Sequence, residues 1–154
     1  MFNTISALEK FGKNHDISDL TFNADGYLNI VLQDEFTIHL QLNSNKDMLS
    51  IFSEVADLSK TNNTILFSNL LKANYFGQHT NQYNFGINPD DNTLILFKSI
   101  DDSIINTSSI ENLICDLLEA VIYWKSHITS QLQEKQNKQV KKQIPNNQFS
   151  FIHV

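Results

Sequence analysis

The sequence predicts an α+β fold, in which an antiparallel β-sheet is flanked by three helices in the order α-β-β-β-α-β-β-α. Apolar residues recur at helical spacing in three separate segments, at the start, the middle and the end of the chain. Between these segments, apolar and polar residues alternate with the period of two that is typical of half-buried strands. Turn residues separate the alternating runs at short intervals, which favours strands joined by hairpins.

The first helix is expected over the opening residues, and Gly12 or Asn14 is expected to end it. Residues three and four apart lie on one side of a helix, so an apolar residue at every third position predicts a single apolar face. This face consists of four residues: Phe2, Ile5, Leu8 and Phe11.

A meander of strands is expected over residues 19–57. Leu20 and Phe22 are expected in its first strand, before the pair Asp25-Gly26, which is a strong signal for a tight turn. The cleanest alternation with polar residues comes from an apolar series further along: Phe36, Ile38 and Leu40.

The second helix is expected to begin at Thr64 or one of the two Asn before it and to run to about Asn74. Its apolar residues do not form one stripe, because Leu66 and Leu70 share a face while Leu71 lies about 100° away. Either the chain covers both faces itself, or a second subunit covers one of them. We favour the second subunit, since so short a chain has few residues left for a further layer.

A strand pair and a long closing helix complete the expected fold. Tyr83 and Phe85 begin an alternating strand that turns back near Pro89. Ser108 and Glu111 have the spacing of a capping box, and an apolar stripe follows to Ile128. Cys115 falls within this stripe, and we interpret it as a buried small apolar residue. From Gln131 the chain is rich in Lys and Gln and ends in apolar residues, so residues 131–154 are a separate extension, either loose or docked.

The sequence contains no pattern of catalytic residues. Its five His lack metal-ligand spacing, and its four Gly form no phosphate-binding loop. We therefore expect no enzyme activity, no metal and no cofactor. A net charge of −6 and eleven basic residues that are all Lys argue against nucleic acid, because Arg makes the bidentate phosphate and base contacts. No apolar run approaches the ~18 residues of a membrane span, and the start lacks the features of a signal peptide, so we expect a cytosolic protein.

A family resemblance connects these elements. The stretch from Ile65 to Thr80 resembles the leucine-rich second helix and the "L-x-x-N-x-F-G" loop of class I type III secretion chaperones, the Tir-chaperone (CesT-like) family. The segments Tyr83–Pro89, Leu94–Leu96 and Leu113–Trp124 are similar to the strands and closing helix that follow in this family. The order of elements agrees from residue 2 to about residue 130, which we take as the chaperone-like domain.

The resemblance implies a cytoplasmic homodimer of a Gram-negative bacterium. Such a chaperone binds the N-terminal segment of a secreted effector in extended form, uses no cofactor and passes its effector to the secretion ATPase. By analogy, the effector-binding residues would be Phe2, Ile5, Leu8, Phe11, Phe36, Ile38 and Leu40. The dimer interface would consist of Leu66, Leu70, Leu71, Tyr83 and Phe85. The alternative is a protein-interaction or regulatory module of the same fold outside secretion.

Overall fold

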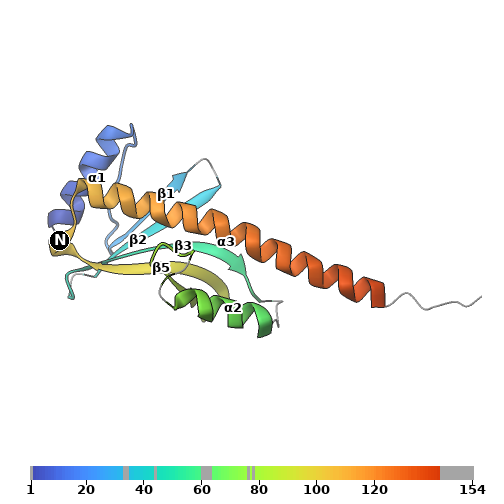
Figure 1. Ribbon diagram of the computed structural model, residues 1–154. Coiled ribbons are helices and arrows are strands. Elements are labelled where there is room, and N and C mark those ends of the chain that lie inside the picture. Colours follow the sequence, from blue (N-terminus) through green and yellow to red (C-terminus); the bar gives the residue numbers. More distant parts are fainter. Residues whose placement is uncertain are drawn as a thin grey trace, which may run out of the picture.

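The computed structural model describes residues 2–142, except 33–34, 44, 60–63, 76 and 78, and without the side chains of Phe2 and of residues 132–142. Within this part, the elements follow the predicted order (Figure 1). They are α1 Phe2–Asn14, β1 Tyr27–Leu32, β2 Phe36–Asn43, β3 Met48–Asp57, α2 Thr64–Asn74, β4 Asn84–Ile87, β5 Thr93–Asp101, the 3-10 helix η1 Asp102–Ile104 and α3 Thr107–Lys142.

The five strands form one antiparallel sheet in the order β1-β2-β3-β5-β4. This confirms the predicted fold class. The meander begins later than predicted, because Leu20 and Phe22 lie outside the strands and the first strand starts at Tyr27. The turn before it is held by the Asn23 carboxamide, which accepts hydrogen bonds from the amides of Asp25 (3.0 Å) and Tyr27 (2.8 Å). This turn therefore leads into β1 and does not join two strands.

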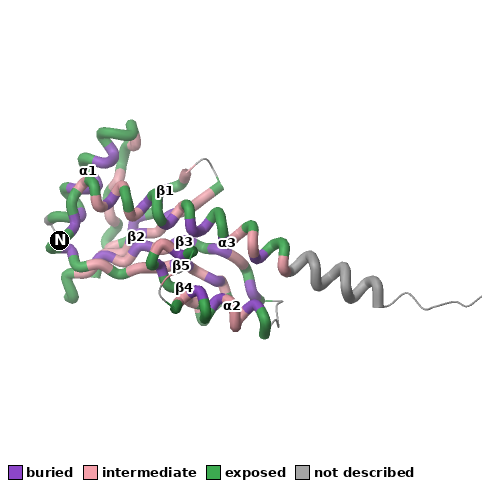
Figure 2. Tube along the Cα trace, in the orientation of Figure 1, coloured by how far each residue is buried: buried purple, intermediate pink, exposed green. Residues whose placement is uncertain are grey.

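Helices cover one face of the sheet. Leu40 of β2 and Ile51 of β3 are paired in register and fully buried on this face, and Leu96 of β5 is buried there as well. Helix α3 packs against β3, and α1 packs against α3, so both helices lie on the same side (Figure 1). The buried positions recur along the strands and the inner side of α3 (Figure 2). The hydrophobic core therefore lies mainly between the sheet and these two helices, and buried residues of α2 extend it beside β4.

Helix α3 supplies the longest apolar stripe of the core. Its buried members are Ile110, Ile114, Leu117, Ala120, Val121, Trp124 and Ile128. The predicted capping box is wrong by two residues, because Asn106 and Ser109 bond reciprocally: the Asn106 carboxamide accepts from the Ser109 amide (2.9 Å), and the Asn106 amide donates to Ser109 Oγ (2.7 Å). Cys115 is exposed and not buried as predicted, since it points about 100° away from Ile114 around the helix.

The start of α1 is fixed by a buried carboxylate. Asp102 in η1 accepts hydrogen bonds from the backbone amide (3.0 Å) and the hydroxyl of Thr4, and both residues are almost completely buried. Asn3 donates to the carbonyls of Asp102 (3.1 Å) and Ser103 (3.2 Å). Since buried charges are tolerated only with such partners, these contacts fix α1 to the junction between β5 and α3.

Helix α2 lies along the outer edge of β4. The Asn74 carboxamide accepts a hydrogen bond from the Phe85 amide (2.7 Å) and donates to the Phe85 carbonyl (3.4 Å), which satisfies both backbone groups of an edge strand. Gly77 follows with φ +66°, and a Cβ there would lie 2.9 Å from Gln82 Cα, so the turn requires glycine. Asn74 and Gly77 are the Asn and Gly of the "L-x-x-N-x-F-G" stretch, which therefore encodes the attachment of α2 to β4.

Replacing Asn74 by Ala should destabilise the protein by about 1–3 kcal/mol, because both Phe85 backbone groups lose their partner. Asn112→Ala is the matched control, since Asn112 is an exposed residue of α3 and the change raises helix propensity slightly. Urea unfolding of both variants measures the difference. Equal midpoints for the two variants would show that the Asn74 contact contributes nothing.

Candidate protein-binding surfaces

Several exposed apolar side chains gather on the outer side of α2 and beside it on β4. Leu71, Tyr75 and Ile65 are 71%, 70% and 67% exposed, and Ile87 of β4 is 48% exposed nearby. A hollow of about 340 Å³ lies between α2 and β4, lined by Phe67, Leu70, Leu71, Asn74, Phe85, Gly86, Ile87 and Leu94. Exposed apolar clusters of this kind mark protein–protein contacts in soluble proteins.

The residues predicted for the dimer interface fall into two groups. Leu66 and Leu70 are buried in the core, and Leu71 alone on α2 is exposed as predicted. Phe85 is half-buried at the rim of the hollow. The sequence analysis missed Ile65, Tyr75 and Ile87. The spacing of Phe67, Leu71 and Tyr75 at four-residue intervals is the signal that could have identified the outer face.

Tyr83 supports this surface from within. It is 1% exposed, and its hydroxyl donates to the Leu113 carbonyl (2.7 Å); burial raises its pKa well above the ordinary value, with a smaller contribution from Asp116. Trp124 Nε1 donates to the His79 carbonyl (2.8 Å), and the Asn81 carboxamide donates to the Asp116 carbonyl (2.9 Å). Together these contacts fix the loop between α2 and β4 to α3.

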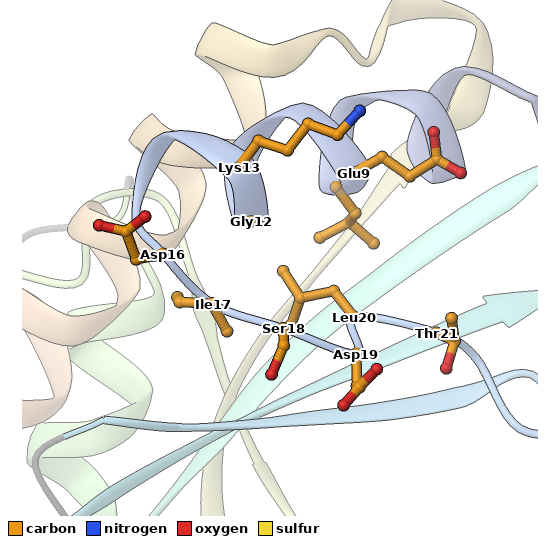
Figure 3. Close-up of a pocket in the computed structure, with 10 residues that line it drawn as sticks. Glu9, Gly12, Lys13, Asp16, Ile17, Ser18, Asp19, Leu20 and Thr21 are labelled. Carbon is orange, nitrogen blue, oxygen red and sulfur yellow. The ribbon is translucent and has the colours of Figure 1, made fainter.

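A second surface lies beside α1. A groove of about 580 Å³ lies between the helix and residues 16–21, with the Leu20 side chain pointing toward α1 (Figure 3). At Gly12 the segment of Ile17 and Leu20 approaches the helix closely, which glycine allows. A Cβ there would lie 2.8 Å from the Ile17 carbonyl oxygen and 3.1 Å from Leu20 Cδ1. The charged residues at the groove are Glu9, Lys13, Asp16 and Asp19. The groove thus combines an apolar floor with a charged rim.

The residues predicted for effector binding are mostly core. Leu8 and Phe11 face the interior, although Leu8 also lines the groove; Ile38 and Leu40 lie under the helices. Two others reach the surface. Ile5 is 43% exposed, and Phe36 is half-buried under the Lys125 ammonium, which lies 5.0 Å from the ring centroid. The side chain of Phe2 lies outside the described residues.

The third surface is the face of the sheet that carries no helix. A hollow of about 490 Å³ crosses it, with Phe52, Ile95 and Phe97 among its large apolar residues and Ile87 of β4 at its margin. His39 stacks on Phe52 at 4.8 Å between ring centroids, and its Nδ1 lies 2.9 Å from Asn29 Oδ1. Nothing in the sequence analysis identified this face, although these residues alternate with the predicted core positions.

The described residues contain no site for metal chemistry. No three His, Cys, Asp or Glu side chains among them lie close enough together to hold an ion. None of the described helices combines the length and the apolar composition needed to cross a bilayer.

Comparisons with known proteins agree with this geometry. The model of the Tir chaperone protein (CesT) family matches residues 6–125. Similar solved structures include the ExsC–ExsE complex, with a TM-score of 0.68 and 17% identity over 78% of this chain and 89% of that chain. The HopA1–SchA chaperone–effector complex has a TM-score of 0.67 and 16% identity, and the match covers 80% of this chain and 93% of that chain. The structure of the Yersinia pestis type III secretion chaperone SycH with a stable fragment of YscM2 has a TM-score of 0.61 and 16% identity. This match covers 77% of this chain and 97% of that chain. Comparison with curated protein sequences gives no match.

The environment of His39 predicts a loss of stability in acid. Burial lowers its pKa below 6.5, and the Glu54 carboxylate opposes this by a smaller amount. The pKa of His39 is lower in the folded chain than in the unfolded chain, so the unfolded chain takes up the proton more readily. The free energy of unfolding therefore decreases as the pH falls below about 6.5. Urea midpoints measured at about pH 7.5 and pH 5 should differ less in His39→Gln than in the wild type. An unchanged difference would mean that His39 titrates alike in both states.

Proposed function

The chain belongs to the Tir chaperone protein (CesT) family, and on this premise we propose that it is a homodimeric chaperone for a type III secreted effector. It binds the effector's N-terminal segment in extended form and keeps that segment competent for export. The observation that carries the proposal is the set of exposed apolar surfaces on a fold shared with a chaperone–effector complex and with a type III secretion chaperone bound to a protein fragment.

The dimer contact is proposed at the outer side of α2. Leu71 and Tyr75 are one helical turn apart on this side, and Ile87 extends the apolar surface onto β4. Two copies related by a two-fold axis bury the same patch on each subunit, which suits a continuous apolar surface of this kind. The buried residues Leu66 and Tyr83 then act as support, because they fix α2 and β4 without reaching the partner.

The groove beside α1 is proposed as one effector-binding site. An extended segment requires apolar pockets for alternate side chains, and Leu8, Ile17 and Leu20 supply apolar surface in this groove. Ile5 and Phe36 are the predicted effector-binding residues that reach the surface of the single chain. Binding an unfolded segment costs ordering entropy, so several such contacts must act together.

The remaining assignments follow from the same premise. We place the chaperone domain at residues 1–130 and the extension at residues 131–154. Helix α3 continues into this extension as far as Lys142, and the apolar end, from Phe149 to Val154, lies outside the described residues. We propose a cytoplasmic location, no catalytic activity of its own, and the secretion ATPase as the recipient of the effector.

Leu71→Asp should convert the dimer to a monomer, because each subunit would bury a carboxylate in an apolar contact. Light scattering should give a mass near twice 17.7 kDa for the wild type and near 17.7 kDa for the variant. The control is Ile104→Asp, since Ile104 is similarly exposed, at 67% against 71% for Leu71, but lies in η1 beside the start of α1. A monomeric wild type contradicts the homodimer, and a dimeric Leu71→Asp variant contradicts this interface.

Ile5→Asp should weaken binding of the effector segment without changing the dimer. The measurement is co-purification of the chain with the N-terminal segment of a type III effector from the same bacterium, with protease sensitivity reporting that the segment stays extended. Ile122→Asp on α3 is the control, because Ile122 is 48% exposed and Ile5 is 43% exposed. Equal capture by both variants would remove Ile5 from the site. Capture of no secreted segment by the wild type would overturn the proposed chaperone function.

A further inference from the structure

The face of the sheet opposite to the helices has a defined chemical order. Sheet register places His39, Phe52, Phe97 and Asn84 in one row across β2, β3, β5 and β4. Adjacent strands lie about 4.8 Å apart, so the rings of the first three form a short aromatic stripe perpendicular to the strands. Every residue in this row is exposed or half-buried. The stripe is therefore accessible to a partner.

The positions beside the stripe differ in polarity. On one side, Ser50 faces Ser99 on the paired strand, with their hydroxyl oxygens 2.9 Å apart. On the other side, Glu54 faces Ile95, which places an exposed carboxylate next to an apolar side chain. A ligand that lies on the stripe thus contacts apolar surface and has a negative charge beside it, at the Glu54–Ile95 pair.

The charges on this face have one sign. Glu54 and Asp101 lie on it by the alternation of β3 and β5, and the register shift between Glu54 and Ala56 brings Asp57, paired with Thr93, to the same face. Lys98 is the one lysine in the five strands, and it points to the helix side, where its ammonium lies 5.6 Å from the Tyr83 ring centroid. Lys125 of α3 lines a neighbouring hollow with Glu54, but its ammonium lies over the Phe36 ring. His39 is mainly neutral at pH 7, because burial lowers its pKa.

We propose that the aromatic stripe and Glu54 bind an extended segment of the effector that carries a lysine or arginine next to apolar residues. This inference deepens the proposed function and depends on it. Apolar side chains of the segment pack on Phe52 and Phe97, and the cation lies against Glu54. Both contacts fit one segment, because alternate residues of an extended chain lie about 6.8 Å apart on the same side.

Charge decides among the other occupants of this face. A second copy would bring Glu54 and its neighbouring acids against the same acids of its partner, which like-charge repulsion disfavours. Nucleic acid is repelled for the same reason. A positively charged, partly apolar segment is attracted by the charge and covers the rings.

The test uses three synthetic peptides of about twelve residues with the same alternating valine pattern and with Lys, Ser or Glu at the two central polar positions. Fluorescence anisotropy measures their binding to the full-length protein. The Lys peptide should bind best and lose affinity as salt rises from about 0.05 to 0.3 M. Glu54→Lys should weaken binding of the Lys peptide about five- to tenfold and abolish its advantage over the Glu peptide.

Asp25→Lys is the matched control, since it makes the same change in net charge at an exposed residue of the turn before β1, outside the proposed binding surfaces. It should leave the preference for the Lys peptide intact. Phe97→Thr, which keeps a residue suited to a strand, should weaken all three peptides. Equal effects of Glu54→Lys and Asp25→Lys, or no preference among the peptides, would overturn the inference. A dimer lost in Glu54→Lys would assign the face to a second copy and overturn it as well.

Failure here and failure of the proposed function can be told apart. If the wild type captures the effector segment but Glu54→Lys changes no peptide preference, the chaperone function stands and this site is wrong. If the wild type captures no effector segment, the proposed function falls, and the inference about this face falls with it.

Discussion

Helices cover only one face of the five-stranded sheet, and this constraint determines where the molecule can bind a partner. The residues that pack under α1 and α3 are buried in the core of the single chain and cannot contact a partner. They include Ile38, Leu40 and Ile51. What remains for contacts is the other face, the margin of α1 and the edge beside β4. The proposed dimer contact, the groove and the aromatic stripe lie at these three places. The one-sided core thus separates residues that hold the fold from residues that bind.

The edge beside β4 shows how the two groups cooperate. Buried side chains fix the backbone of this region: Tyr83 bonds to α3, Trp124 bonds to the loop, and Asn74 bonds to β4. Exposed apolar side chains are then presented on a rigid support. A substitution in the first group should cost stability before it costs binding, while a substitution such as Leu71→Asp acts on association itself. The distinction follows from burial and not from sequence position.

The fold could be predicted from the sequence because periodicity reports it directly. The alternation in β2 and the apolar stripe of α3 each place the apolar residues on one side of the element, so that side must face the core. Both elements are present in the structure as predicted. The exact start of α3 was harder to predict from the sequence, because Ser108 and Asn106 are both good helix caps. The choice of Asn106 depends on the three-dimensional course of the chain before the helix. The binding surfaces were the hardest part. Alternation shows that Ile38 and His39 face opposite sides, but it does not show that the His39 side stays open. The surplus of apolar residues indicated partner binding, yet most of the predicted interface residues turned out to be core.

A chaperone for an extended segment must bind strongly without enclosing its partner. None of the three surfaces meets this need alone, because each is open and offers few apolar anchors. Several weak contacts along one segment can, since each contact after the first is made within the same complex and costs less entropy. The acidic character of the chain adds long-range attraction for basic segments and guards against association of free subunits through their open faces. In the proposed complex the aromatic stripe supplies affinity, and Glu54 determines which part of the segment lies on it.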